Sequence, residues 1–152
     1  MGMTQIPYEP HVQQSIVLIV DDNPAIRDMV SWALELDGFE SAEAAEGQEA
    51  LDWISNAARE GRYPAAILLD LAMPGMDGST FLTRLRERWT APYPLPAVIV
   101  ITARAGKQNA SSLGVDQIIV KPFHMRDLLD AVRRFIGESA RMGDTGEQNR
   151  SA

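Results

Sequence analysis

Residues 66–78 of the chain read AILLDLAMPGMDG, an apolar run that ends on one carboxylate, Asp70, and then passes into turn-forming residues. A continuous apolar run of this kind is typical of a strand that is buried on both faces of a sheet. Asp70 therefore comes at the carboxyl end of a central strand, where ligands bind in open α/β sheets. From this stretch alone, Asp70 is either a residue that begins a loop or a reactive carboxylate.

The composition indicates one globular domain and excludes several kinds of chemistry. The chain has 152 residues, of which 45% are hydrophobic and 23% are charged, and it contains no cysteine. Disulfides, thiolate nucleophiles and cysteine-ligated metals are therefore excluded. The formal charge of -7 argues against a nucleic-acid surface. Because the apolar runs are too short to cross a bilayer and no signal peptide is recognisable, we expect a cytoplasmic protein with no nucleic-acid or membrane partner.

Predicted strands and helices alternate along the middle of the chain. Four apolar runs and one weaker candidate predict strands. Helical spacing of apolar residues follows four of them, whereas the segment after the strand at 97–101 predicts only a short, marginal helix. The five candidates cover residues 16–20, 39–45, 66–70, 97–101 and 118–120. This order is typical of a parallel sheet with helices on both faces. We expect the domain at residues 15–137, with a disordered leader at 1–14 and a disordered tail at 138–152.

Four of the five expected strands are followed by polar residues with related chemistry. They are Asp21 and Asp22, Asp70, Thr102, and Lys121. Each has an ordinary explanation by itself, because acids favour helix starts and Asp and Thr often begin loops. In a parallel sheet, however, the carboxyl ends of the strands all lie at one edge. A site that uses three carboxylates, a hydroxyl and an ammonium explains the set better than chance does.

Such a set of side chains predicts phosphoryl chemistry that depends on a metal ion. Three neighbouring carboxylates repel one another unless a cation lies among them. Oxygen ligands without Cys or His favour Mg²⁺ or Mn²⁺, and Mg²⁺ readily shares phosphate oxygens. Lys121 and Thr102 would then flank the oxygens of a transferred phosphoryl group. In this interpretation Asp70 is the nucleophile that accepts it.

The chain resembles the receiver domain of response regulators in two-component signalling. The resemblance covers Ser15 to Gly137 and is carried by four motifs in a fixed order. They are Asp21-Asp22, Leu69 to Gly78, Ile101-Thr102-Ala103 and Val120-Lys121-Pro122-Phe123. The resemblance implies an α/β flavodoxin-like fold, a doubly wound five-stranded parallel sheet with strand order 2-1-3-4-5. We expect no output domain after Gly137, and therefore a single-domain, chemotaxis-regulator-like receiver.

The resemblance also implies roles for particular residues. Asp70 would accept phosphate from a phosphohistidine of a sensor histidine kinase or a histidine phosphotransfer protein. Asp21, Asp22, Asp70 and the backbone carbonyl of Ala72 would bind Mg²⁺, while Thr102 and Lys121 would contact the phosphoryl group. The Lys121-Pro122 peptide is expected to be cis. The protein would then be a phosphorelay switch that acts on an unknown downstream protein, and not an enzyme beyond its own phosphorylation and slow dephosphorylation.

Three positions depart from the family pattern or stand where the family tunes its response. Ile118 occupies a switch position that usually holds an aromatic residue, whose rotation follows the Thr102 hydroxyl. Ala72 and Arg104 occupy positions that tune the lifetime of the acyl phosphate. The segment between Thr102 and Lys121 is about one helical turn shorter than usual, so a short or irregular fourth helix is expected.

Two other functions compete with the phosphoryl-accepting switch. One is a phosphatase with an aspartyl nucleophile, which usually has a second acid two residues after the nucleophile; Ala72 stands there instead. The other is a degenerate receiver that binds a protein partner without phosphorylation. Ile118 and the short fourth segment favour this second alternative, whereas the complete set of acids, Thr102 and Lys121 opposes it.

Overall fold

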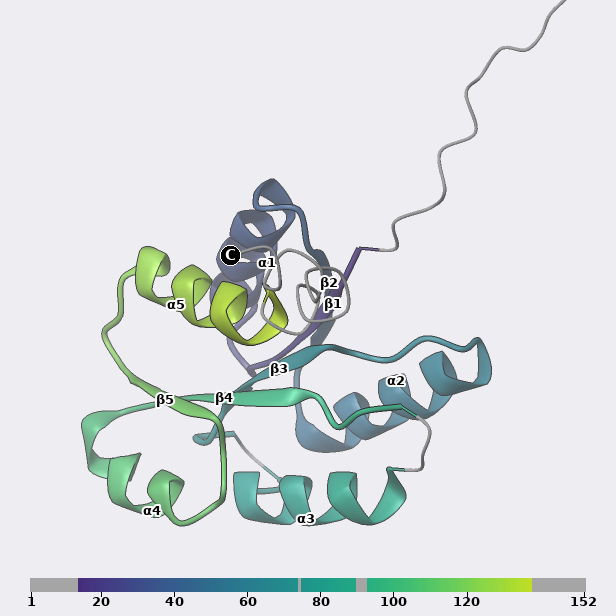
Figure 1. The fold of residues 1–152 in the computed structure, drawn as a ribbon. Helices are drawn as coiled ribbons and strands as arrows, with labels where there is room; N and C mark the ends of the chain where they lie inside the picture. Colours follow the sequence, from purple (N-terminus) through teal and green to yellow (C-terminus); the bar gives the residue numbers. More distant parts are fainter. Residues whose placement is uncertain (1–13, 74, 90–92, 138–152) are drawn as a thin grey trace, which may run out of the picture.

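The computed structural model describes residues 14–73, 75–89 and 93–137, which form one five-stranded parallel sheet covered by helices (Figure 1). The strands are β1 (Ile16–Val20), β2 (Glu40–Ala44), β3 (Ala66–Asp70), β4 (Ala97–Thr102) and β5 (Gln117–Val120). Their spatial order is β2-β1-β3-β4-β5, with every neighbouring pair parallel. The flavodoxin-like topology expected from the sequence is confirmed.

Helices cover both faces of the sheet, as predicted. One face carries α1 (Pro24–Leu36) and α5 (Met125–Val132), which continues as a π-helical turn over Arg133–Gly137. The other face carries α2 (Gly47–Arg59), α3 (Gly78–Arg88) and α4 (Lys107–Ser111) (Figure 1). The sheet therefore has an apolar core on each side, and its central strands are covered on both faces.

Strand β3 shows why the sequence forms this central element. Leu68 packs into the core under α1 and α5, whereas Ile67 and Leu69 pack into the core under α2 and α3. Successive side chains of a strand point to opposite faces, so a strand between two helical layers must be apolar at every position. Burial of one such leucine contributes about 1.5–3 kcal/mol to the free energy of unfolding.

Local capping determines where the helices next to the carboxyl edge of the sheet begin. The Oδ1 atom of Asn23 accepts a hydrogen bond from the backbone N–H of Ala25 at 2.9 Å, and Pro24 occupies the first turn of α1. Asp77 caps α3 in the same way, with its Oδ1 2.7 Å from the backbone nitrogen of Thr80. These caps satisfy backbone donors that a helix start would otherwise leave unpaired.

The fourth helix is short, as the sequence predicted. Helix α4 has five residues and follows a 3₁₀ turn at Arg104–Gly106. The predicted leader, apart from Gln14, and the predicted tail lie outside the described residues. Among the helices that the structure describes, none is both long and apolar enough to cross a membrane.

Candidate functional site

Three carboxylates meet at the carboxyl edge of β1 and β3. Val20 pairs with Leu69 in the parallel register, so the next residues, Asp21 and Asp70, come side by side. One carboxylate oxygen from each of Asp21, Asp22 and Asp70 lies within 4.8 Å of the others. Asp21 and Asp70 are each only 3% exposed, whereas Asp22 is exposed. The register of two strands therefore builds the cluster that the sequence predicted.

Backbone hydrogen bonds orient the two buried carboxylates. The N–H of Asn23 donates to Oδ1 of Asp21 at 2.8 Å, and the N–H of Ala72 donates to Oδ1 of Asp70 at 3.0 Å. Both are bonds from residue i+2 to the side chain of residue i, as in an Asx turn. Each carboxylate is thus fixed by the loop that follows its strand.

Arg27 holds the loop that follows β1, a role that its place in the sequence did not predict. Its Nη1 donates to the backbone carbonyl oxygen of Asp21 at 2.6 Å, and its Nε lies 3.2 Å from Oε1 of Glu43 on β2. The guanidinium therefore links the start of α1 to the β1–α1 loop and to the edge strand. The signal in the sequence was only that Arg27 lies six residues after Asp21, which does not point to a role.

The electrostatics of the cluster favour a cation. Burial raises the pKa of Asp21 above its usual value, and the negative charges of Asp70 and Asp22 raise it further. The Asn23 hydrogen bond and the charge of Lys121 lower it in part. The three acids offer only oxygen ligands, without His or Cys, and such a donor set fits Mg²⁺ or Mn²⁺. The acidic cluster is therefore consistent with binding of Mg²⁺.

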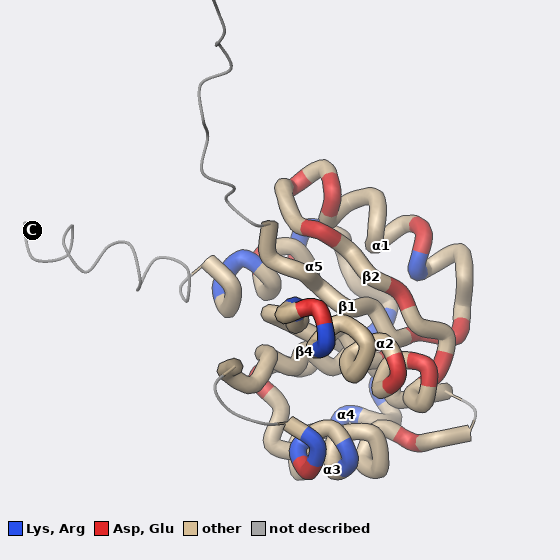
Figure 2. Tube along the Cα trace, turned by 90° about the vertical axis from the view of Figure 1, so that its right-hand side faces the viewer, with Lys and Arg blue, Asp and Glu red and all other residues tan. Residues whose placement is uncertain are grey.

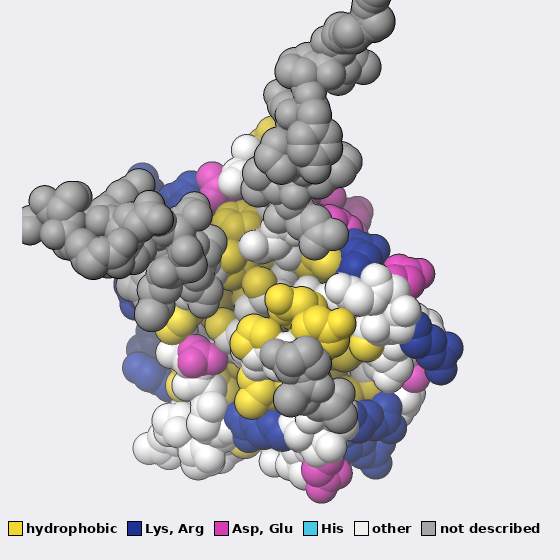
Figure 3. Space-filling view, turned by 45° about the vertical axis from the view of Figure 1, so that its right-hand side comes forward, with side chains coloured by type: hydrophobic (Ala, Val, Ile, Leu, Met, Phe, Trp, Pro, Cys, Tyr) yellow, Lys and Arg dark blue, Asp and Glu magenta, His cyan; other side chains and the backbone are white. Residues whose placement is uncertain are grey.

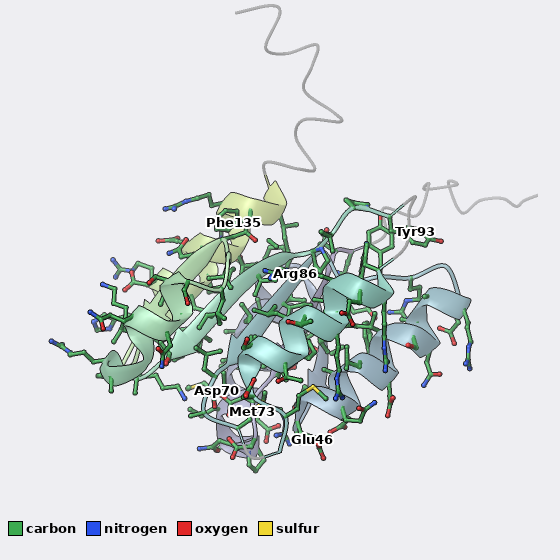
Figure 4. The ribbon with its side chains drawn as sticks, turned by 90° about the horizontal axis from the view of Figure 1, so that it is seen from below. Glu46, Asp70, Met73, Arg86, Tyr93 and Phe135 are labelled. Atoms are coloured by element: carbon green, nitrogen blue, oxygen red, sulfur yellow. The ribbon has the colours of Figure 1, made fainter. Side chains whose placement is uncertain are left out.

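Thr102 and Lys121 complete the edge on the other side of β3. Thr102 is the last residue of β4 and is 3% exposed. The backbone N–H of Lys121 donates to the carbonyl oxygen of Thr102 at 2.8 Å. The Nζ atom of Lys121 lies 3.5 Å from Oδ1 of Asp70. The Lys121-Pro122 peptide is cis, as expected. Lys121 therefore places a positive charge directly beside Asp70. Figure 4 labels Asp70 close to Met73 of the β3–α3 loop.

Gly106 is a second residue that sequence reasoning missed. A Cβ atom at this position would collide with Oγ1 of Thr102, so only glycine lets the 3₁₀ turn approach the Thr102 hydroxyl this closely. A glycine four residues after the strand end was the available signal, but its meaning depends on the turn geometry.

Two of the three remaining predicted positions lie in loops at this edge. Ala72 is exposed in the β3–α3 loop, and Arg104 is exposed at the start of the 3₁₀ turn. Ile118 pairs with Val100 and is half-buried against the core under α2 and α3. The structure thus places Ala72 and Arg104 in the loops that follow β3 and β4, whereas Ile118 packs on one face of the sheet.

A doubly wound five-stranded sheet with this edge chemistry defines the class of receiver domains. The sequence profile of the response regulator receiver domain matches residues 17–133. The chain belongs to this family.

Among curated proteins, the transcriptional regulatory protein SrrA of Staphylococcus aureus is 39% identical over 123 residues, covering 79% of this chain and 47% of SrrA. The chain therefore spans about half the length of the curated relatives it matches.

Solved structures agree with this assignment. The chemotaxis response regulator CheY4 of Vibrio cholerae is 32% identical, with a TM-score of 0.68 over 81% of this chain and 99% of that one. The response regulator TrrA of Thermotoga maritima, in complex with Mg²⁺ and BeF, is 28% identical, with a TM-score of 0.65 over 80% of this chain and 99% of that one.

Proposed function

We propose that this chain is a phosphoryl-accepting switch of a two-component or phosphorelay system. Asp70 is the acceptor, and the donor is a phosphohistidine on a sensor histidine kinase or a histidine phosphotransfer protein. The observation that carries the proposal is the surroundings of Asp70, with Nζ of Lys121 at 3.5 Å and the carboxylates of Asp21 and Asp22 within 4.8 Å. Membership of the receiver family supports it.

In the proposed reaction an oxygen of Asp70 attacks the phosphorus atom of the donor. The new O–P bond forms as the P–N bond to the donor imidazole breaks, and the electron pair of that bond leaves with the imidazole nitrogen. Bound by Asp21, Asp22, Asp70 and the Ala72 carbonyl, Mg²⁺ would offset the negative charge that the carboxylates and the phosphoryl oxygens bring together.

Lys121 and Thr102 are the remaining groups that touch the reacting atoms in this proposal. The ammonium of Lys121 neutralises charge on a phosphoryl oxygen, and the Thr102 hydroxyl donates a hydrogen bond to another. We propose that Thr102 also carries the signal toward Ile118. Because an isoleucine has no ring to rotate, this transmission would use a repacking of the Ile118 side chain, and Ala72 and Arg104 would set the lifetime of the acyl phosphate.

The test is phosphorylation by a small donor, followed by intact mass. With acetyl phosphate and Mg²⁺ the chain is expected to gain one phosphoryl group, and the gain is expected to disappear in Asp70→Asn and after removal of Mg²⁺. Asp52→Asn is the matched control, since Asp52 is an exposed acid on α2 that accepts a hydrogen bond from Gln48. An adduct that survives in Asp70→Asn contradicts the assignment of the acceptor.

A second candidate is a receiver that binds a cytoplasmic protein partner without phosphorylation. Two departures from the family pattern favour it: α4 has only five residues, and Ile118 stands where an aromatic switch residue is usual. Both pack on the side of the sheet that would change when Asp70 is phosphorylated. In that case neither an adduct at Asp70 nor binding of Mg²⁺ is expected. Turnover of many phosphoesters per molecule would instead indicate a phosphatase.

A further inference from the structure

The edge of the sheet opposite Asp70 carries an apolar groove that the proposed function does not use. We define the amino-edge groove by six of its lining residues, Ser15, Tyr63, Pro64, Leu95, Phe135 and Ile136. It is a hollow of about 680 Å³. Figure 4 places Tyr93 and Phe135 at this end of the molecule and Asp70 at the other. Hydrophobic side chains gather on this face between basic ones (Figure 3).

Two aromatic side chains, Tyr63 and Phe135, line the groove. The rings of Tyr63 and Tyr93 lie 4.6 Å apart, and Nε1 of Trp89 donates to the carbonyl oxygen of Tyr93 at 2.8 Å. Tyr63 also lines a neighbouring hollow of about 240 Å³ between α2 and α3, together with Trp89 and Tyr93. Leu95 on the rim is 57% exposed. Leu95 therefore extends the apolar lining of the groove to the surface of the molecule.

We propose that the amino-edge groove binds residues 6–12 of the same chain. These residues read IPYEPHV and lie outside the described residues. Pro7 and Pro10 are three positions apart, so in a polyproline II helix, which has three residues per turn, both prolines lie on one face. Aromatic-lined grooves are the usual receptors of such segments. The proposal does not depend on phosphorylation of Asp70.

The point at which the chain enters the domain supports this occupant. Ser15 lines the groove itself, and Gln14 and Ser15 line an adjoining hollow beside Tyr63. At about 3.1 Å per residue, a polyproline II segment places Pro10 about 16 Å and Pro7 about 25 Å from Ser15. The segment can therefore enter the groove directly from Ser15 without a long loop.

Charge complements the apolar contacts. Residues 1–13 contain one acid, Glu9, and no Lys or Arg. Arg86 lines the groove and Arg88 lines the neighbouring hollow, and both belong to the last turn of α3. Figure 2 shows basic residues in blue on the tube of α3. Within the part of the chain that the structure describes, neither arginine has a carboxylate partner, and Arg86 donates only to the carbonyl oxygens of Leu113 and Gly114.

The C-terminal residues are the rival occupant. They leave the described domain beside Ile136, which also lines the groove. Residues 138–152, however, contain Met142 as their only large apolar side chain, whereas residues 6–12 contain Ile6, Tyr8 and Val12. The apolar groove therefore favours the N-terminal segment.

Paramagnetic broadening in the full chain tests the proposal. Because the chain has no native cysteine, Thr4→Cys gives a single attachment point for a nitroxide label. At an effective concentration of the order of 1 mM, a segment with a dissociation constant of similar size occupies the groove about half of the time. We expect the amide signals of Tyr63 and Leu95 to lose about half of their intensity, and those of Gly47 and Asp77 at the opposite edge to keep theirs.

Two control pairs decide between the outcomes. The same loss is expected to persist in Leu36→Glu and to disappear in Leu95→Glu, which changes an exposed leucine of the groove instead of one on α1. A label at Ser151→Cys is expected to leave Tyr63 and Leu95 unaffected. The proposal would be overturned by equal, weak broadening over the whole domain, or by stronger broadening from a label at residue 151 than from one at residue 4. It would also be overturned if labelled chains broaden the signals of unlabelled ¹⁵N-enriched chains in a mixture, because the groove would then bind a second copy.

Discussion

Carboxylates at the two ends of the strands have pKa values that are shifted in opposite directions. At the carboxyl edge, burial raises the pKa of Asp21, and the charges of Asp70 and Asp22 raise it further. At the other end, Asp37 follows α1, and its hydrogen bonds with the Arg133 guanidinium lower its pKa. The first edge gathers three carboxylates whose repulsion Lys121 offsets only in part, whereas the second pairs opposite charges. The proposed site and this stabilising ion pair therefore lie at opposite ends of the strands.

The largest effect is expected when the positive charge of Lys121 is removed from the carboxyl edge. Lys121→Met is expected to slow phosphorylation by acetyl phosphate about 100-fold, because it removes a preorganised charge beside Asp70, the proposed acceptor. The rate is measured from the increase of phosphorylated protein in intact mass spectra. Lys107→Met is the matched control, since Lys107 is the only other lysine and is exposed on α4. Equal rates for the two variants would contradict the role given to Lys121.

Substitutions at the amino edge are expected to change the free energy of unfolding and to leave the rate of phosphorylation unchanged. Tyr63→Ala removes the ring that packs against Tyr93 and is expected to lower the free energy of unfolding by about 1–2 kcal/mol. Urea unfolding measures this change, and Tyr63→Phe, which keeps the ring, is expected to lose far less. The rate of phosphorylation of both variants should match that of the unmodified chain. A slower rate in Tyr63→Ala would mean that the two edges are coupled.

The carboxyl edge could be predicted from the sequence because its residues follow directly from strand ends. A buried run identifies each strand, and parallel register then brings the next residues together, as Val20 and Leu69 do for Asp21 and Asp70. Arg27 and Gly106 were missed because their roles depend on a carbonyl oxygen and a hydroxyl whose positions only the folded loops determine. The amino-edge groove is formed by helix, strand and loop residues from distant parts of the chain, and periodicity carries no signal for it.

The acidic cluster is expected to lower the free energy of unfolding when no metal is bound. In the presence of EDTA, Asp21→Asn is expected to raise the free energy of unfolding at pH 7 by about 1 kcal/mol, because it removes a buried charge next to like charges. The pKa of Asp21 is higher in the folded than in the unfolded chain, so this gain develops as the pH rises above about 4 and is absent below it.

Excess Mg²⁺ is expected to reverse the order of the two proteins. The unmodified chain gains stability from a metal that binds only the folded state, and Asp21→Asn loses most of that gain. Asp28→Asn, an exposed acid on α1, is the control in both conditions. If Asp21→Asn is less stable than the unmodified chain in EDTA, the acidic cluster does not oppose folding.

The smallest expected effect concerns the ion pair at the other end of the molecule. Nε and Nη2 of Arg133 donate to the two carboxylate oxygens of Asp37 at 2.7 and 2.8 Å, over a separation of 96 residues. Because Arg133 is about half exposed, solvent screens the pair, and Arg133→Gln is expected to lower the melting temperature by a few degrees at most.

The pH dependence of this small effect has the opposite sign to that of Asp21. The pKa of Asp37 is lower in the folded than in the unfolded chain, so its pairing stabilises the protein above about pH 4 and is lost as the pH falls through the folded value. The difference in melting temperature between Arg133→Gln and the unmodified chain should therefore be largest near neutral pH and vanish in acid. Arg59→Gln, which removes an exposed arginine of α2 with no carboxylate partner in the described part of the chain, is the control. A difference that grows as the pH falls would show that Arg133 acts through packing of its aliphatic stem at the end of α5 and not through the Asp37 carboxylate.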